Sequence, residues 1–204
     1  MGTQYRADII VVGSLKAKII SMTFSNSNVK HAYQEIKANP NYNKKIELVF
    51  LSSKLVFGLE HILGIMKILS ERKKRNIISD IKNLEIEFLM RVCCTDQISE
   101  ALRVNFGDRS NKEFVVIIIS DDEVTLQEIE KEFARYGNSE HDESSSTNNI
   151  QTCNKDLIAA DTYKRDYIID QFFREKIKDS NSPVLKSNTE FLKFLVERAA
   201  ISIC

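Results

Sequence analysis

Three consecutive carboxylates, Asp121, Asp122 and Glu123, are the residues best suited to chemistry by type and spacing. They follow the apolar run 114–119, and α/β enzymes often hold Mg²⁺ on carboxylates at the end of such a strand. Ser120 and Glu123 also have the spacing of a helix capping box, which explains the acidic residues without a metal. Because no second acidic cluster or phosphate-binding loop accompanies them, we expect helix capping, no metal site and no cofactor.

The other side chains that commonly perform catalysis lack the spacing of a known motif. His31, His61 and His141 are isolated in the sequence, without the spacing of metal ligands. Cys93 and Cys94 are adjacent, and we interpret them as small apolar packing residues. No G-x-S-x-G, G-x-x-x-x-G-K-[ST] or G-x-G-x-x-G segment occurs. The sequence therefore favours a non-enzymatic binding protein.

A run of four cations directly follows a long predicted helix. Cations at this place complement the negative C-terminal end of the helix dipole, and they could also contact RNA phosphates. Because the formal net charge of the chain is zero, only a local patch could attract nucleic acid. The run therefore predicts either an RNA-contacting surface or a solvated helix end. The predicted RNA-binding residues are Arg72, Lys73, Lys74, Arg75 and, further along the chain, Lys82.

The long helix, predicted over residues 54–71, carries more apolar surface than one buried stripe requires. Its main stripe contains Leu55, Val56, Leu59, Ile62, Leu63, Met66 and Leu69. At about 100° per residue, Phe57, Ile65 and Ile68 fall outside this arc and line up with His61. Leaving such side chains in water forgoes roughly 1.5–3 kcal/mol each, so we expect that another surface covers them.

The last predicted helix, 189–203, has the same surplus. Phe194 and Ile201 lie apart from its main face, which contains Phe191, Leu192, Leu195, Val196, Ala199 and Ile203. Either both helices are sandwiched within their own domain, or each keeps a second face for another protein, recognised helix against helix. The second alternative predicts the partner-binding residues Phe57, His61, Ile65, Ile68, Phe194 and Ile201.

Strands and helices alternate along the chain, which predicts an α/β (α+β) fold. We expect a single domain over residues 1–204, with a mixed β-sheet and helices packed on it. The predicted strands are 7–15, 17–24, 46–51, 84–94 and 114–119. The predicted helices are a segment around 29–36, the long central helix 54–71, 96–106, a segment after 120–123 that ends at 137, 163–178 and the C-terminal helix 189–203.

Composition adds three expectations about the rest of the chain. The segment 138–154 is polar and carries few apolar side chains, which predicts a disordered insertion. No apolar run is long enough to cross a membrane. The cysteines form no C-x-x-C pair and no secretory leader is visible, which indicates a reducing compartment, cytoplasm or nucleus.

The segment 87–107, EFLMRVCCTDQISEALRVNFG, predicts a buried strand that turns directly into a short one-sided helix. Thr95 and Asp96 offer side-chain oxygens to the helix start, and Gly107 is expected to be a left-handed stop. This segment resembles the PRPK-binding protein (TPRKB) family. The resemblance rests on Ile98-Ser99-Glu100-Ala101-Leu102, on Glu87 eleven positions before it, on Phe106-Gly107 after it, and on the stretch Lys82-Asn83-Leu84-Glu85-Ile86-Glu87.

The resemblance implies a non-catalytic subunit of the KEOPS/EKC complex, which makes threonylcarbamoyl-adenosine in tRNA. Such a subunit binds and regulates a PRPK-type kinase/ATPase as a heterodimer, and it assists tRNA binding, at the tRNA 3′ end. The surplus apolar helix faces would then contact the kinase, and the cations of residues 72–75 with Lys82 would contact tRNA. Two alternatives remain: a small Mg²⁺-dependent enzyme that uses residues 121–123, and an autonomous RNA-binding domain.

Overall fold

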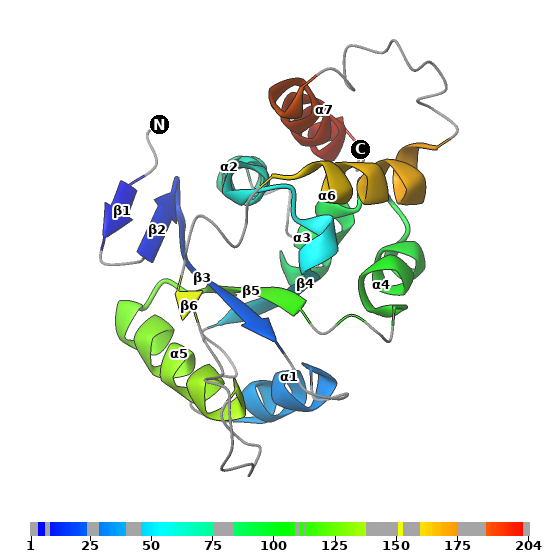
Figure 1. The fold of residues 1–204 in the computed structure, drawn as a ribbon. Helices are drawn as coiled ribbons and strands as arrows, with labels where there is room; N and C mark the ends of the chain where they lie inside the picture. Colours follow the sequence, from blue (N-terminus) through cyan, green and yellow to red (C-terminus); the bar gives the residue numbers. More distant parts are fainter. Residues whose placement is uncertain are drawn as a thin grey trace. The chain divides into compact units, whose positions relative to one another are not determined.

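The computed structural model describes most of the chain (Figure 1), namely residues 4–6, 9–23, 29–39, 46–75, 84–108, 111, 113–137, 151–152, 160–174 and 187–201. The sequence predicts one domain, whereas the contacts group the chain into two compact units. A sheet unit contains Met1–Phe50 and Arg109–Asn154. A helical unit contains Leu51–Asp108 and Lys155–Cys204.

The sheet unit begins with an antiparallel meander. Strand β1 (Gln4–Arg6) pairs with β2 (Ile9–Val12), and β2 pairs with β3 (Leu15–Thr23). Gly13, with a φ of 59°, allows the tight turn between β2 and β3, because glycine adopts left-handed backbone conformations without steric cost. Sequence analysis predicted both of the strands that flank this turn.

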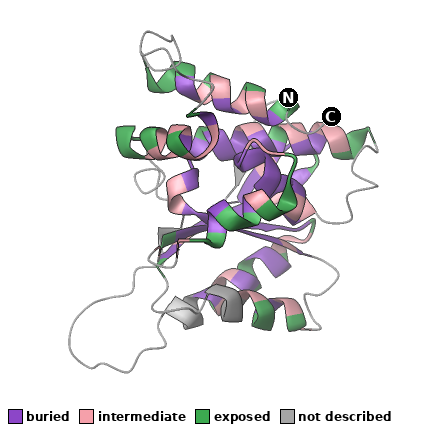
Figure 2. Cartoon of the chain, turned by 90° about the vertical axis from the view of Figure 1, so that its right-hand side faces the viewer, coloured by how far each residue is buried: buried purple, intermediate pink, exposed green. Residues whose placement is uncertain are grey.

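The centre of the sheet is formed by the most apolar run of the chain. Strand β5 (Glu113–Ile119) pairs antiparallel with β3, so that Ala17 lies opposite Ile119 and Thr23 opposite Glu113. Strand β4 (Glu47–Ser52) adjoins β5, which gives the order β1-β2-β3-β5-β4 among the described residues. Every residue of β5 after Glu113 is buried, and the strands are mostly purple in Figure 2. The predicted burial of this strand on both faces is confirmed.

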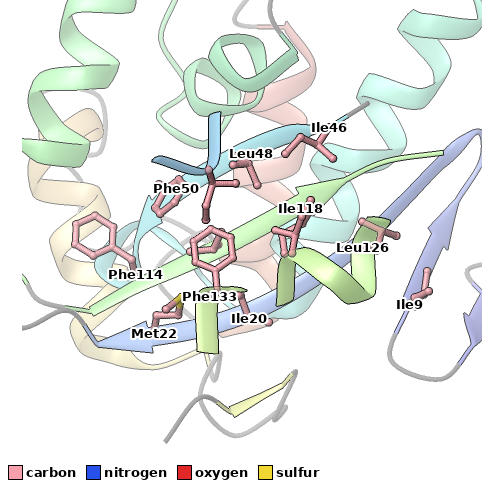
Figure 3. Close-up of a cluster of buried hydrophobic side chains, with 13 residues drawn as sticks. Ile9, Ile20, Met22, Ile46, Leu48, Phe50, Phe114, Ile118, Leu126 and Phe133 are labelled. Atoms are coloured by element: carbon pink, nitrogen blue, oxygen red, sulfur yellow. The ribbon is translucent and has the colours of Figure 1, made fainter. Parts of the chain in front are cut away.

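Two helices complete the sheet unit. Helix α5 (Glu123–Gly137) packs on β3, and α1 (Val29–Ala38) packs against α5. Their apolar side chains meet alternate residues of the strands in one buried cluster (Figure 3), which includes Ile36, Ile20, Met22, Leu48, Phe50, Phe114, Val116, Ile118, Leu126, Ile129 and Phe133. Lys16 and Lys18 of β3 reach over to α5 and form ion pairs with Glu123 and Glu130.

The predicted disordered insertion, 138–154, lies almost entirely outside the described residues. Its residues Gln151–Thr152 nevertheless form a short strand, β6, which pairs antiparallel with Ile20 and Ser21 of β3. This part of the segment therefore has a defined structure, because it pairs with the stretch of β3 that lies beyond the residues paired with β2.

The helical unit consists of five helices and two short helical turns in the described residues. The turn η1 (Ser53–Leu55) precedes α2 (Leu59–Lys74), and α3 (Leu84–Val92), α4 (Ile98–Phe106), α6 (Thr162–Ile168), the π-helical turn η2 (Ile169–Phe173) and α7 (Asn188–Ile201) follow. Helix α2 packs against α3 and α7, and α3 packs against α4 and α7. These elements confirm the predicted α/β (α+β) class, with its long helix and its C-terminal helix.

The predicted strand 84–94 is wrong, because Leu84–Val92 is helix α3. Apolar and acidic residues alternate at the start of this segment, which is the period of a half-buried strand. The helix instead brings Glu87 and Arg91, four residues apart, within 2.9 Å between carboxylate and guanidinium. Residues at this spacing are neighbours on a helix, whereas in a strand Glu87 and Arg91 would lie two side-chain repeats apart.

The long predicted helix starts later than the sequence indicates. Gly58 has a φ of 87°, a backbone conformation that side-chain-bearing residues rarely adopt, and α2 begins only at Leu59. Residues 53–55 form a separate helical turn. No helix among the described residues is long and apolar enough to cross a membrane.

Candidate partner and RNA surfaces

Three of the residues predicted to bind a partner lie inside the helical unit. Phe57, His61 and Ile65 are buried, so the prediction that they form an exposed second face is wrong. The Phe57 ring packs edge-on against Phe191 of α7, with ring centroids 4.8 Å apart. The surplus apolar face of α2 is therefore covered by the unit's own helices. This agrees with the alternative in which the helix is sandwiched within its own domain.

His61 is held as a neutral side chain. Its Nδ1 accepts a hydrogen bond of 3.3 Å from the backbone N–H of Phe57, and its buried Nε2 has no hydrogen-bond partner. Burial lowers the pKa of His61 to about 4, because the charged imidazolium would lose its hydration. This histidine stabilises the turn before α2 rather than a partner interface.

The remaining three predicted partner residues differ in exposure. Ile68 is half-buried, and so is Phe194, whose ring packs against Phe173 at 4.9 Å between centroids. Phe194 also adjoins the buried aromatic cluster of Phe57, Phe173 and Phe191. Ile201, at the end of α7, keeps 59% of its surface exposed. Of the six predicted residues, Ile201 alone is classed as exposed.

The first residue of the predicted RNA-binding run is engaged inside the protein. The Nε atom of Arg72 lies 2.8 Å from Oε1 of Glu87, whose side chain is fully buried. Arg91, also fully buried, donates two hydrogen bonds to the same oxygen and one to the backbone carbonyl of Ala199. We name this group of Arg72, Glu87, Arg91 and the Ala199 carbonyl the ionic cluster.

The other residues of the run have different positions. Lys73, Lys74 and Arg75 are exposed at the end of α2, while Lys82 lies outside the described residues. Glu87 has a structural role in the ionic cluster, where it compensates two buried or half-buried guanidinium groups. Buried charges require such pairing because desolvation is costly.

Helix α4 exposes an apolar stripe along one of its sides. Ile98, Leu102 and Phe106 are exposed by 50%, 38% and 45%. Ala101, Val104 and Asn105 face the core instead. The signal was present in the sequence, because residues 98, 102 and 106 follow the four-residue repeat of one helix side, whereas 101, 104 and 105 occupy another.

The ends of α4 also differ from the sequence prediction. Gln97 is the N-cap residue and makes no side-chain capping bond, and Thr95 Oγ1 accepts a hydrogen bond from the Gln97 N–H at 3.2 Å. Gly107 is right-handed, with a φ of −73°. The left-handed residue of this region is Cys94, with a φ of 47°, at the end of α3.

A second surface of the helical unit combines tyrosines with cations. Lys54 Nζ lies 2.7 Å from Asp108 Oδ2 and 5.7 Å from the centre of the Tyr167 ring. The hydrogen bond that Lys54 donates to Asp108 raises the pKa of Lys54, and burial raises the pKa of Tyr167. Tyr163, one helical turn before Tyr167, is exposed. Because Asp108 neutralises Lys54, this surface carries little excess charge.

The acidic residues that could have held Mg²⁺ act at the start of α5. Asp122 accepts hydrogen bonds from the Val124 N–H at 3.1 Å and from the Thr125 hydroxyl at 2.6 Å, and Glu123 forms an ion pair with Lys16 at 2.9 Å. An acidic residue therefore caps α5 as expected, but it is Asp122, whereas the predicted capping box had paired Ser120 with Glu123. Within the described residues no three His, Cys, Asp or Glu side chains are grouped as metal ligands would be.

Comparison of the chain with protein-family models and with curated proteins finds no match.

Proposed function

We propose that this chain is a non-catalytic subunit of a KEOPS/EKC complex that binds and regulates a PRPK-type kinase/ATPase and assists tRNA binding. Support comes from the ISEAL-centred resemblance together with the arrangement of the same segment. The proposal places the chain in the cytoplasm and nucleus, where this complex modifies tRNA.

One observation carries the proposal: the segment that bears the resemblance folds into α4 and leaves Ile98, Leu102 and Phe106 exposed. Three large apolar side chains along one side of a nine-residue helix are more than a solvated helix needs. Such a stripe fits the helix-based recognition of another protein. We therefore propose that α4 contacts the kinase, with Ile201 as a further contact.

Co-elution of the purified chain with the kinase on a sizing column tests this proposal. Ile98→Asp and Leu102→Asp, both at exposed positions, should remain folded and lose the complex at micromolar concentrations. Gln97→Asp, at the exposed N-cap of the same helix and about 100° from Ile98, is the matched control and should still co-elute. Separate elution of the wild-type chain, or intact binding by both stripe variants, would contradict the proposal.

The second part of the proposed function is contact with tRNA through Lys73, Lys74 and Arg75. Their exposure supports this assignment, whereas Arg72 is half-buried and its Nε faces Glu87, so we propose no direct contact for it. Lys attracts a phosphate as a point charge, and Arg can donate two parallel hydrogen bonds to it. Replacing all three cations by alanine should weaken tRNA binding, measured by fluorescence anisotropy, and should leave co-elution with the kinase unchanged.

A further inference from the structure

Strand β3 extends beyond the strand that pairs with it on one side. On its first side, β5 pairs with residues 17–23 of β3 without a gap. On its second side, the pairing with β2 ends at Ala17. Strand β6 occupies this second side opposite Ile20 and Ser21 (Figure 1). Residues 18–23 therefore form a sheet edge, which we name the β3 edge, and among the described residues β6 is the strand that covers it.

The side chains of the β3 edge are mostly apolar and buried, including Ile19, Ile20 and Met22. A strand edge of this kind offers backbone N–H and C=O groups with which another chain can pair. Natural sheets often protect such an edge with a charged side chain, most commonly lysine. Lys18 is the lysine of this edge, but it is buried and its ammonium is paired with Glu130 of α5. Its charge therefore does not protect the edge.

Strand β6 provides this protection instead. Its two residues lie at the centre of the β3 edge, with two edge residues on either side of Ile20 and Ser21. Successive residues of an antiparallel strand direct their N–H and C=O groups to alternate sides, so one of Ile20 and Ser21 directs these groups toward β6. Because so few backbone groups are involved, β6 can separate from β3 while the pairing of β3 with β5 stays intact.

The β3 edge is also complementary to itself. Two copies of it can pair antiparallel about the point that β6 covers. The residues opposite each other are then Ile20 and Ser21, Ile19 and Met22, and Lys18 and Thr23. This register places apolar residues opposite each other and brings no two like charges together. The contact is two-fold and closed, so it produces a dimer rather than a fibre.

We infer that the β3 edge is a pairing surface for a second copy of this chain, and that β6 is a strap that closes this surface. The chain is a monomer while β6 is paired with β3, and two copies pair edge to edge when β6 separates. This inference is independent of the proposed function, because β3 and β6 belong to the sheet unit, whereas α4 and the cations 73–75 belong to the helical unit.

Proline at both positions of β6 tests the strap, because proline has no N–H group to donate to a neighbouring strand. In sedimentation velocity from micromolar to submillimolar concentrations, the wild type should be a monomer and the full chain with Gln151→Pro and Thr152→Pro should form a dimer. Ser145→Pro with Ser146→Pro lies in the same polar segment outside β6, and this matched control should remain a monomer. A monomeric β6 variant, a dimeric wild type or larger oligomers of the β6 variant would overturn the inference.

Hydrogen exchange, measured by mass spectrometry at two protein concentrations, locates the contact. In the dilute proline variant of β6, the edge-facing amides of residues 18–23 should exchange about tenfold faster than in the wild type, while the amides of β5 keep their protection. At concentrations that give the dimer, the protection of residues 18–23 should return. A dimer without this return uses another surface, which would contradict the inference.

A second variant decides the question if the prolines also remove the protection of β5. Gln151→Gly with Thr152→Gly keeps both N–H groups but weakens the strand, because glycine lowers strand stability. This variant should form more dimer than the wild type and less than the proline variant. If it sediments as the wild type does, β6 is not a strap.

Discussion

At the scale of single residues, the buried charges of this chain serve structure rather than catalysis. Glu87, Arg91 and Arg72 share one carboxylate oxygen inside the helical unit. Sequence analysis named Arg72 as a candidate RNA contact, because exposed charged side chains and buried ones look alike in a sequence. Glu87 and Arg91 lie four positions apart on α3, but the contact between Arg72 and Glu87 joins residues 15 positions apart on different helices, which no local pattern reveals.

Arg91→Met should be among the most destabilising single substitutions of the helical unit. It removes the buried partner of Glu87 and leaves only half-exposed Arg72 beside that carboxylate. Breaking a buried ion pair costs about 3–5 kcal/mol, which urea unfolding would measure. Arg103→Met is the matched control, because Arg103 forms an exposed pair with Glu100 whose loss should cost far less, since solvent screens the pair. Similar losses in both variants would show that the buried cluster contributes no more than a surface pair.

The buried imidazole of His61 should make stability dependent on pH below neutrality. Its pKa is lowered from 6.5 to about 4 in the folded chain, so the unfolded chain binds the proton more tightly. Above pH 6.5 the free energy of unfolding is therefore not reduced by this residue. As the pH falls from 6.5 toward 4, the free energy of unfolding decreases by about 3 kcal/mol in total.

Urea unfolding at pH 7.5 and at pH 5 measures this loss. His61→Asn is the matched control, because an amide oxygen can replace Nδ1 as acceptor for the Phe57 N–H without titrating. The variant should show a smaller loss of stability between the two pH values than the wild type. Parallel losses in both proteins would assign the pH dependence to other groups.

At the scale of elements, apolar periodicity was sufficient to predict the secondary structure of some segments and misleading for others. Strand β5 and helix α5 were predictable, because one is a continuous apolar run and the other buries Leu126, Ile129 and Phe133 at helical spacing. Helix α3 was not, because alternation at its start has the period of a strand while its stability comes from the Glu87–Arg91 pair and from neighbouring helices.

The contact between α2 and α7 depends on the absence of a side chain at Gly64. Gly64→Ala would place a methyl group 2.6 Å from Val196 Cγ2, which requires Val196 or the helices to shift. Overpacking costs about 1–3 kcal/mol, and the better helix propensity of alanine returns about 1 kcal/mol, so we expect a net loss of about 1 kcal/mol.

A double-mutant cycle in thermal or urea unfolding checks this origin. Val196→Ala removes the two methyl groups that the new side chain would meet. In the Val196→Ala background, Gly64→Ala should therefore be neutral or stabilising. An equal loss in both backgrounds would place the cost elsewhere than in the α2–α7 contact.

At the scale of the whole molecule, sequence analysis predicted the class but not the division into units. Alternating strands and helices predicted an α/β fold, and both the sheet and its helices were found. The segments 51–108 and 155–204 form a helical unit of their own, although residues of the sheet unit separate them in the sequence. The surplus of apolar side chains on α2 reflects this division, because a helix within an all-helical unit is covered on more than one side. The exposed stripe of α4 then carries the partner-binding proposal that α2 had been expected to carry.

The charge of the whole molecule makes a final prediction about RNA. The chain has 29 basic and 29 acidic residues, so any attraction for RNA must come from a local surplus such as Lys73, Lys74 and Arg75. Three phosphate contacts to a single strand give a slope of about −2 for the logarithm of the binding constant against the logarithm of the salt concentration. Anisotropy of a labelled oligouridine across a potassium chloride series measures this slope, and alanine at all three positions should bring it close to zero. A slope steeper than about −5 would require an extended basic surface, and it would contradict the assignment of RNA contact to the end of α2.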